Sequence, residues 1–283
     1  MIRAVRSLLM LSLLVVLGAA VPPAAAQDSP HAPIPPAGIG VETLFEAAFP
    51  AETIPAENPR VYFVRQRYLP GAIFDRPAIP AAEYVLSGSL VVRSAGRVVV
   101  QRGSAGARQP VEEIAPGSEA TVGAGDAAVY LSNGAAQTVR NSESTPAITL
   151  KVIVVTATEA AGALPRAFAP YILGHLSTFD WKRSALPVGP MRVRVERLTA
   201  APGASVPRST TELPVLRFVE AGQLTWAIET PATLLAPMLA AVHFRRGQAV
   251  PYQRQPDGWH ILLRSSGDEP LVLLVLTTMP AAG

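Results

Sequence analysis

The stretch Glu83-Tyr84-Val85-Leu86-Ser87-Gly88-Ser89-Leu90 consists of two short apolar runs separated by a single glycine. Runs of this length that are rich in apolar and β-favouring residues predict strands. Glycine adopts the positive φ of a tight bend without steric cost. The stretch therefore predicts a strand, a bend at Gly88 and a returning strand.

The same pattern recurs later in the chain as Arg217-Phe218-Val219-Glu220-Ala221-Gly222-Gln223-Leu224. Other landmarks recur in the same order. The turn sequence Pro70-Gly71-Ala72 is matched by Pro202-Gly203-Ala204, and residues 137–141 are matched by residues 260–264. A repeat that keeps the order of its landmarks indicates a duplicated domain.

The composition favours an all-β chain with two domains. It has 283 residues, of which 49% are hydrophobic and 16% are charged, so a well-buried core is easily formed. The 28 prolines and 21 glycines predict many turns. The absence of cysteine excludes disulfides, thiolate metal sites and a cysteine nucleophile.

The N-terminus has the pattern of a secretory signal peptide. Arg3 and Arg6 precede an apolar run from Leu8 to Val21, and Ala24-Ala25-Ala26 offers a small-residue cleavage site. This pattern predicts cleavage after Ala26 and a secreted or periplasmic protein. The alternative is an uncleaved anchor, but the run is shorter than the roughly 20 residues of a membrane helix. We expect no membrane span after cleavage.

The charge balance of the mature protein gives no reason to expect a nucleic-acid partner. Cleavage removes two of the 24 basic residues and none of the 21 acidic ones, which leaves 22 − 21 = +1. No cluster of basic residues remains to form an electrostatic footprint for nucleic acid.

Changes in composition predict the layout of the mature chain. Residues 27–57 are rich in proline and alanine and are expected to be a leader, with one short helical turn near Glu42 to Phe49. Strand patterns predict a first barrel over residues 58–157 and a second over residues 191–283, joined by a connector over residues 158–190.

One expected strand, Ala147 to Thr156, is almost continuously apolar, and Lys151 is its only charged residue. Such a run is typical of a strand that is buried on both faces. By contrast, Met191 to Glu196 alternates apolar and charged residues, which predicts a strand with one buried face.

These landmarks resemble the two sequence motifs of the cupin superfamily, whose domains are small jelly-roll barrels. Gly88 stands at the closing glycine of the first motif. Gly125-Asp126 opens the second motif, Gly134 stands at its second glycine and Asn141 at its asparagine. The resemblance implies an all-β fold with two tandem jelly-roll (cupin-like) β-barrels in one chain, a bicupin.

The resemblance covers about residues 60–156 and, with fewer matches, residues 191–279. Many cupin-like proteins dimerise by exchanging edge strands, so it also implies a homodimer.

The metal-binding positions of that family hold other residue types in this sequence. Ala81 stands at the position of the family's glutamate, Phe74 to Pro77 span its His-x-His pair, and Gln137 replaces its remaining histidine. In the second repeat, Val215 stands at the glutamate position, and only His260 occupies a ligand position. A transition-metal site needs three or four converging donors. We therefore expect no metal and no cofactor.

Two charged residues are candidate ligand-binding groups because of their place on the strands. Side chains alternate along a strand, so Glu83 shares a face with Ala81, which faces the barrel interior in the family. Arg217 stands at the corresponding distance before Gly222 in the second repeat. The alternative is that both lie in solvent at the barrel mouths, because Glu and Arg are rarely buried without a partner.

Four further residues complete the candidate set. Gln137 can donate and accept hydrogen bonds inside a barrel, or it can be a structural amide tied to backbone. Asn141 either contacts a ligand or fixes a turn, because asparagine bonds its own backbone readily. His260, beside Trp259, can bind a ligand or carry a proton, or it can be a core or rim histidine.

From these residues we expect an exported, metal-free protein that binds a small molecule and has no catalytic residues. The first alternative is a metal-independent, isomerase-like enzyme that uses His260, Gln137 and Glu83. The second is a structural or partner-binding module. A solvent-open pocket lined by at least three polar residues would favour binding or catalysis, whereas a barrel filled with valine, leucine and phenylalanine would favour the module.

Overall fold

The computed structural model describes most of the chain after its first 37 residues. The described ranges are 38–103, 111–156, 171–186, 188–206, 214–229, 241–250 and 260–281. The expected signal peptide, residues 1–26, lies outside them. Among the described residues, no helix has the length and apolar character that crossing a membrane requires.

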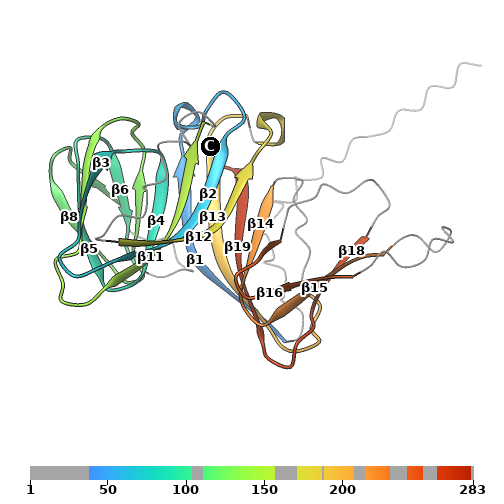
Figure 1. Cartoon of the computed structure of the whole chain (residues 1–283). Helices are drawn as coiled ribbons and strands as arrows, with labels where there is room; N and C mark the ends of the chain where they lie inside the picture. The colour runs from blue at the N-terminus through green and yellow to red at the C-terminus, as the bar shows by residue number, and fades with distance from the viewer. Residues whose placement is uncertain are drawn as a thin grey trace, which may run out of the picture. The chain divides into compact units, whose positions relative to one another are not determined.

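The first barrel is built from two antiparallel sheets (Figure 1). One has the strand order β3 (Ile73–Pro77), β10 (Ala136–Arg140), β5 (Ser89–Ser94) and β8 (Glu119–Gly123). The other has the order β12 (Tyr171–Asp180), β2 (Arg60–Tyr68), β11 (Ala147–Val155), β4 (Ala81–Ser87), β9 (Ala127–Tyr130), β6 (Val98–Gln101) and β7 (Val111–Ile114).

The pairing of these strands is nested, as in a jelly roll. Strand β2 pairs with β11, β3 with β10, β4 with β9 and β5 with β8. Consecutive strands therefore alternate between the two sheets, apart from the inserted hairpin β6–β7. A long hairpin folded over on itself in this way produces the two-sheet jelly-roll barrel.

The second barrel repeats this arrangement. One sheet has the order β1 (Ile39–Phe49), β13 (Met191–Ala200), β19 (Leu271–Pro280), β14 (Val215–Ala221) and β17 (Ala249–Val250). The other has the order β16 (Val242–Arg245), β15 (Gln223–Glu229) and β18 (His260–Ser265). Strands β13 and β19, β14 and β17, and β15 and β16 form the nested pairs. The predicted all-β fold with two jelly-roll barrels is confirmed.

Both glycine bends take the predicted conformation. Gly88, between β4 and β5, and Gly222, between β14 and β15, each have a φ of 76°. A Cβ atom at Gly88 would lie 2.9 Å from the Cα of Ala147, and one at Gly222 would lie 2.6 Å from the carbonyl oxygen of Pro270. Only glycine fits both the backbone angle and the close approach of the last strand.

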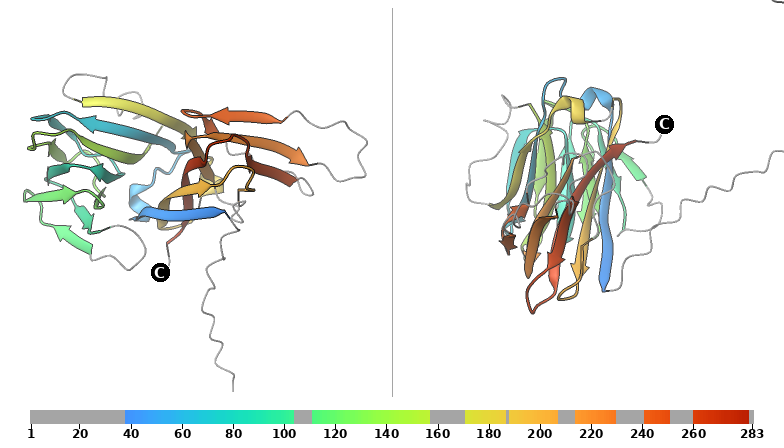
Figure 2. Two further views of the ribbon diagram at one scale, coloured as in Figure 1. Left: turned by 90° about the horizontal axis from the view of Figure 1, so that it is seen from below. Right: turned by 90° about the vertical axis from the view of Figure 1, so that its right-hand side faces the viewer.

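Strand β1 corrects one prediction. Residues Glu42 to Phe49, expected to hold a helical turn within a leader, lie in this strand, which pairs antiparallel with β13 (Figure 2). Phe45, Ala47 and Phe49 are buried at alternate positions. That period of two fits a strand, and the proline- and alanine-rich surroundings conceal it in the sequence. The 3-10 helix η1 (Ala51–Thr53) follows the strand.

The expected connector, residues 158–190, also contains barrel structure. Its described part holds β12, which pairs with β2 at the edge of the first barrel, and the 3-10 helix η2 (Arg183–Ala185). Thus β1, which precedes the first barrel in the sequence, is an edge strand of the second barrel. Strand β12, which precedes the second barrel, is an edge strand of the first. The barrel boundaries 58–157 and 191–283 stay a prediction.

Buried apolar residues from both barrels form one common cluster. It includes residues of β1, β2, β4, β9, β11, β13, β14 and β19. Within it, the ring of Phe45 from β1 stacks on the ring of Tyr84 from β4, with centroids 5.7 Å apart. Complete burial of a phenylalanine stabilises a fold by about 1.5–3 kcal/mol. The residues of this cluster lie on one face of their sheets. The opposite faces of the same sheets line the two barrel interiors.

Candidate functional site

Glu83 lies inside the first barrel. It is only 1% exposed, and its neighbours Ala81 and Val85 belong to the apolar cluster that fills this barrel. Alternation along β4 places the Glu83 side chain on the same interior face. The structure therefore favours the inward placement over a solvated place at the mouth.

The partner of Glu83 is Lys151, which faces it from β11. The two residues are directly paired in register. Lys151 Nζ donates to Glu83 Oε2 at 2.9 Å, and the two side chains are 0% and 1% exposed. A buried charge must be paired and hydrogen-bonded to be tolerated. Sequence reasoning missed this pair, although Lys151 stood out as the one charged residue of its strand.

Three hydroxyl groups complete the surroundings of the Glu83 carboxylate. Tyr68 donates to Oε1 at 2.8 Å and Thr149 donates to the same atom at 3.0 Å. Tyr130 donates to Oε2 at 3.3 Å, and its ring centroid lies 4.9 Å from Lys151 Nζ. With four donors, the carboxylate is fully satisfied within the protein.

The environment sets the protonation states of this cluster. Burial opposes ionisation of Glu83, but the Lys151 and Arg76 charges and the Tyr68 hydroxyl lower its pKa below the ordinary value. Burial and the Arg76 charge lower the pKa of Lys151 to about 8, against the attraction of Glu83. Burial and the Glu83 charge raise the pKa of Tyr68 and Tyr130 well above the ordinary value. At neutral pH the cluster is an ion pair held by neutral phenols.

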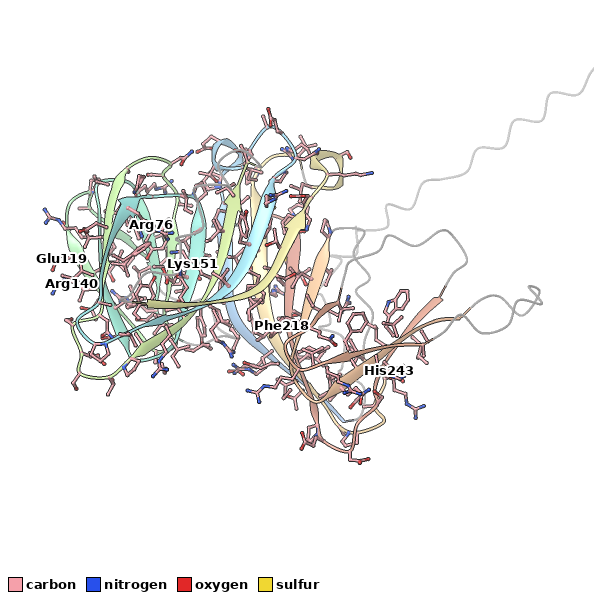
Figure 3. The ribbon with its side chains drawn as sticks, viewed as in Figure 1. Arg76, Glu119, Arg140, Lys151, Phe218 and His243 are labelled. Atoms are coloured by element: carbon pink, nitrogen blue, oxygen red, sulfur yellow. The ribbon has the colours of Figure 1, made fainter. Side chains whose placement is uncertain are left out.

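Arg76 and Gln137 lie at one end of the same barrel and have unsatisfied polar atoms. They are directly paired in register across β3 and β10. The Arg76 guanidinium lies 4.8 Å above the Phe74 ring, and its Nε and Nη1 atoms are buried without a hydrogen-bond partner. Arg76 and Lys151 lie in the same barrel in Figure 3. Residues opposite each other in an antiparallel pair project to one face, so the two side chains are neighbours.

Gln137 is the more deeply buried of the two. It is 3% exposed, and neither Oε1 nor Nε2 has a partner at hydrogen-bonding geometry. Its amide lies beside Tyr130 and lowers the pKa of that phenol against the larger effects of burial and Glu83. Buried polar atoms without partners are rare and call for an explanation.

A hollow of about 480 Å³ opens beside these two residues. Its lining residues are Asp75, Arg76, Pro77, Gly134, Ala136, Gln137 and Thr138. Asp75 and Thr138 bond to each other at 2.6 Å, and Asp75 is exposed. The hollow therefore meets the expectation of at least three polar lining residues, and Arg76 and Gln137 are the two with unused hydrogen-bonding capacity.

Asn141 has a structural role, because its side-chain amide is bonded to backbone groups. Its Nδ2 donates to the carbonyl oxygens of Tyr68 at 3.1 Å and Thr145 at 2.8 Å, and its Oδ1 accepts from the Glu143 amide at 3.0 Å. All of its polar atoms are used to hold the turn after β10, as the turn alternative expects.

The remaining candidates belong to the second barrel and are not brought together with Glu83 or Gln137. Arg217 lies on β14, and burial lowers its pKa to about 10. His260 begins β18, where its backbone pairs with Glu229. Trp259 lies outside the described residues, and the structure does not describe the His260 side chain.

The interior of the first barrel does not fit a metal ion. Ala81, at the family's glutamate position, is buried and has no donor atom. The Glu83 carboxylate is occupied by Lys151 and three hydroxyls, and the Lys151 ammonium would repel a cation. Within the ranges that the structure describes, no three His, Cys, Asp or Glu residues converge. The metal-free state itself stays a prediction.

Comparisons with known proteins found likeness only among solved structures. No family model matches the chain, and no curated protein matches it. The oxalate decarboxylase of Bacillus subtilis is 14% identical, with a TM-score of 0.39 over 86% of this chain and 74% of its own. The coconut allergen cocosin is 13% identical, with a TM-score of 0.36 over 77% of this chain and 76% of its own.

AerE from Microcystis aeruginosa is 14% identical, with a TM-score of 0.33 over 78% of this chain and 88% of its own. All three are bicupin-type members of the cupin superfamily. Because every one of these TM-scores is below 0.5, the fold assignment rests on the nested strand pairing of this chain. That pairing is the two-barrel arrangement that the resemblance implied.

Proposed function

We propose that this cupin-like, two-barrel protein is exported and binds a small molecule at the open end of its first barrel, without catalysing a reaction. The observation that carries the proposal is the buried amide of Gln137. Neither of its polar atoms has a partner at hydrogen-bonding geometry, its nearest polar neighbour is the Tyr130 phenol, and it lines the hollow beside Arg76. A ligand that enters the hollow would supply the missing hydrogen bonds and remove the cost of leaving these atoms unpaired.

The titratable groups support binding more than catalysis. General acid–base chemistry requires a group within hydrogen-bonding reach of the substrate. Glu83 and Lys151 form an ion pair with each other, and both side chains are buried. The isomerase-like alternative also needed His260, Gln137 and Glu83 together, but His260 belongs to the other barrel.

The residues that line the second barrel support a structural role for that barrel. Its described interior is lined mainly by apolar side chains, together with Arg217, which lies between Val215 and Val219 on the same face of β14. The apolar cluster contains Ile39, Leu198, Ala200, Val206, Val215, Val219, Leu224, Val250, Leu263, Leu271, Leu273 and Val275. We therefore place the ligand in the first barrel and treat the second as its support.

Export is proposed from the N-terminal sequence alone. The basic residues, the apolar run and the small-residue site before Gln27 form a signal-peptide pattern. N-terminal sequencing of protein recovered outside the cytoplasm should begin at Gln27, and retention of residues 1–26 in that material would contradict export by cleavage.

A thermal-shift screen of the mature protein against sugars, carboxylates and phenolics tests ligand binding. A ligand at 100 times its Kd adds about 2.7 kcal/mol of stability, which raises the Tm by roughly 5–10 °C for a chain of this size. Gln137→Leu should lose most of the shift. Arg140→Gln, an exposed change on the outer face of the same strand, should keep it. Failure of every compound class to shift the wild type, or an equal shift in Gln137→Leu, would overturn the proposal.

A further inference from the structure

We propose that the ligand of the first barrel is a small oxyanion, held through a carboxylate or phosphate group by Arg76 and Gln137. This inference rests on the proposed function and names the chemical class of its ligand. It follows from the charge left over inside the barrel and from the unused donors.

The charges that face the interior do not cancel. Lys151 and Glu83 neutralise each other at 2.9 Å, which leaves the Arg76 guanidinium in excess. None of the ion pairs among the residues that the structure describes involves Arg76. A partly buried guanidinium without a counter-ion is costly, and a bound anion would remove that cost.

The carboxylates nearest in sequence and across the sheet are engaged elsewhere. Asp75 faces the outside of the barrel and accepts from Thr138 at 2.6 Å. Glu119 accepts from Arg140 at 2.8 Å, and both lie on the outer side of the barrel (Figure 3). Asp75 lines the same hollow, but it is bonded to Thr138 and forms no ion pair with Arg76, so no carboxylate of the described wall pairs with the guanidinium.

The donors suit an oxyanion better than a neutral molecule. Nε and Nη1 of Arg76 are buried N–H groups without acceptors, and Nε2 of Gln137, beside the Tyr130 phenol, has no acceptor at hydrogen-bonding geometry. Carboxylate and phosphate oxygens accept several hydrogen bonds at once, and bonds from guanidinium to them are about twice as strong as neutral ones. The free Oε1 of Gln137 would in addition accept from a hydroxyl adjacent to the anionic group.

Binding of an anion here should be linked to protonation of the interior. Lys151 is faced by Glu83 from β4, Tyr130 from β9 and Arg76 from β3, and Tyr68 from β2 is bonded to Glu83. The Arg76 charge is one cause of the low pKa of Lys151. An anion at Arg76 would offset that charge and favour the ammonium form, so affinity should fall as pH rises above 8.

Calorimetric titration of the mature protein compares acids with their neutral counterparts at matched ionic strength. Lactate is paired with lactamide, succinate with succinamide, and inorganic phosphate is the third anion. At least one anion should bind, at least tenfold more tightly than any amide. Tighter binding of lactate or succinate than of phosphate indicates a carboxylate ligand, and the reverse order indicates a phosphate ligand.

Two variants locate the site. Arg76→Gln should weaken anion binding tenfold or more, whereas Arg140→Gln should leave it unchanged. If Arg76→Gln does not fold, Arg76→Lys provides the second variant, because it keeps the charge and should retain measurable anion binding. Equal binding in wild type and a folded Arg76→Gln protein would overturn the inference.

The outcomes separate this inference from the proposed function. If a sugar or another neutral compound binds with dependence on Gln137 while the anions do not, the site exists and the oxyanion assignment is wrong. If nothing in either panel binds the wild type, the proposed function itself is wrong.

Discussion

The Nζ atom of Lys151 lies 2.9 Å from the Oε2 atom of Glu83, with both side chains closed off from solvent at directly paired positions of β11 and β4. The pair lies in the same barrel as Arg76, and Tyr68 and Tyr130 donate hydrogen bonds to its carboxylate. Its integrity is therefore a condition for the shape of the proposed ligand site.

Loss of one member of this pair should be far more damaging than loss of both. Lys151→Met or Glu83→Leu leaves an uncompensated buried charge, which costs about 3–5 kcal/mol. The double variant removes both charges and should recover at least half of that loss. Urea unfolding of the four proteins forms the double-mutant cycle. Single variants within 1 kcal/mol of wild type, or a double variant equal to the sum of the singles, would show that the pair is not coupled as described.

The stability of the fold should fall at acidic pH through Glu83. Burial opposes its ionisation, but Lys151, Arg76 and Tyr68 together lower its folded pKa below the ordinary 4.5. A carboxyl with a lowered folded pKa contributes stability that is present above its unfolded pKa and is lost as pH falls through the folded one.

The measurement is the free energy of unfolding of wild type minus that of Glu83→Gln, from pH 7 to pH 2. The difference should shrink as pH falls from about 4.5 to 2. A difference that keeps its size or grows over that range would mean that the folded pKa of Glu83 is not lowered and that its partners do not hold it ionised.

Much of the fold follows from local signals in the sequence. Gly88 and Gly222 can be recognised because a tight bend needs a positive φ, and the bends recur with the same flanking apolar runs. Strand β1 could not be recognised in this way. Its partner β13 begins at Met191, and only that long-range pairing and the stacking of Phe45 on Tyr84 make it a strand.

The candidate site was predictable only in part. The inward placement of Glu83 follows from alternation along its strand, and the choice of Gln137 as a candidate follows from its motif position. Lys151 stands out as the one charged residue of an apolar strand. Its pairing with Glu83, however, depends on the register of two strands that are far apart in sequence. Nothing in the sequence around Arg76 marks it as a binding residue. Its importance comes from the absence of a counter-charge, which is a property of the folded barrel.

Alanine at two glycines of the first barrel, Gly88 and Gly71, should test the close approach of β11 to the bend at Gly88. Gly88 and Gly71 both have positive φ values, 76° and 71°, so Gly→Ala strains the backbone at each by about 1–2 kcal/mol. Only at Gly88 does the new Cβ meet backbone, at 2.9 Å, whereas nothing lies within 4 Å at Gly71.

Gly88→Ala should therefore destabilise the fold by at least about 1 kcal/mol more than Gly71→Ala, because overpacking adds to the strain. Thermal and urea unfolding of both variants provide the measurement. Equal losses at the two positions would show that β11 does not press on the bend as closely as described.

The role of β1 in the common core can be tested on one strand. Phe45 is 1% exposed and packs in the cluster shared by both barrels, whereas Val41 on the same strand is 49% exposed. Phe45→Ala should cost about 3–5 kcal/mol, because it removes a buried ring and leaves a cavity. Val41→Ala should change stability by no more than about 0.5 kcal/mol. A loss below 1 kcal/mol for Phe45→Ala would contradict the integration of β1 into the fold.

The metal-free state has its own test, which does not depend on ligand binding. A transition metal held by three or four side chains would stabilise the fold, and a chelator would then lower the Tm. The interior donors of the first barrel are instead committed to Lys151 and to hydroxyl groups, so treatment with EDTA should leave the Tm unchanged. Elemental analysis of the purified mature protein should find less than about 0.1 equivalent of Fe, Mn, Ni or Zn, an adventitious trace compared with the full equivalent of a structural site. A full equivalent that is removed by EDTA with a fall in Tm would mean that residues outside the described ranges complete a metal site.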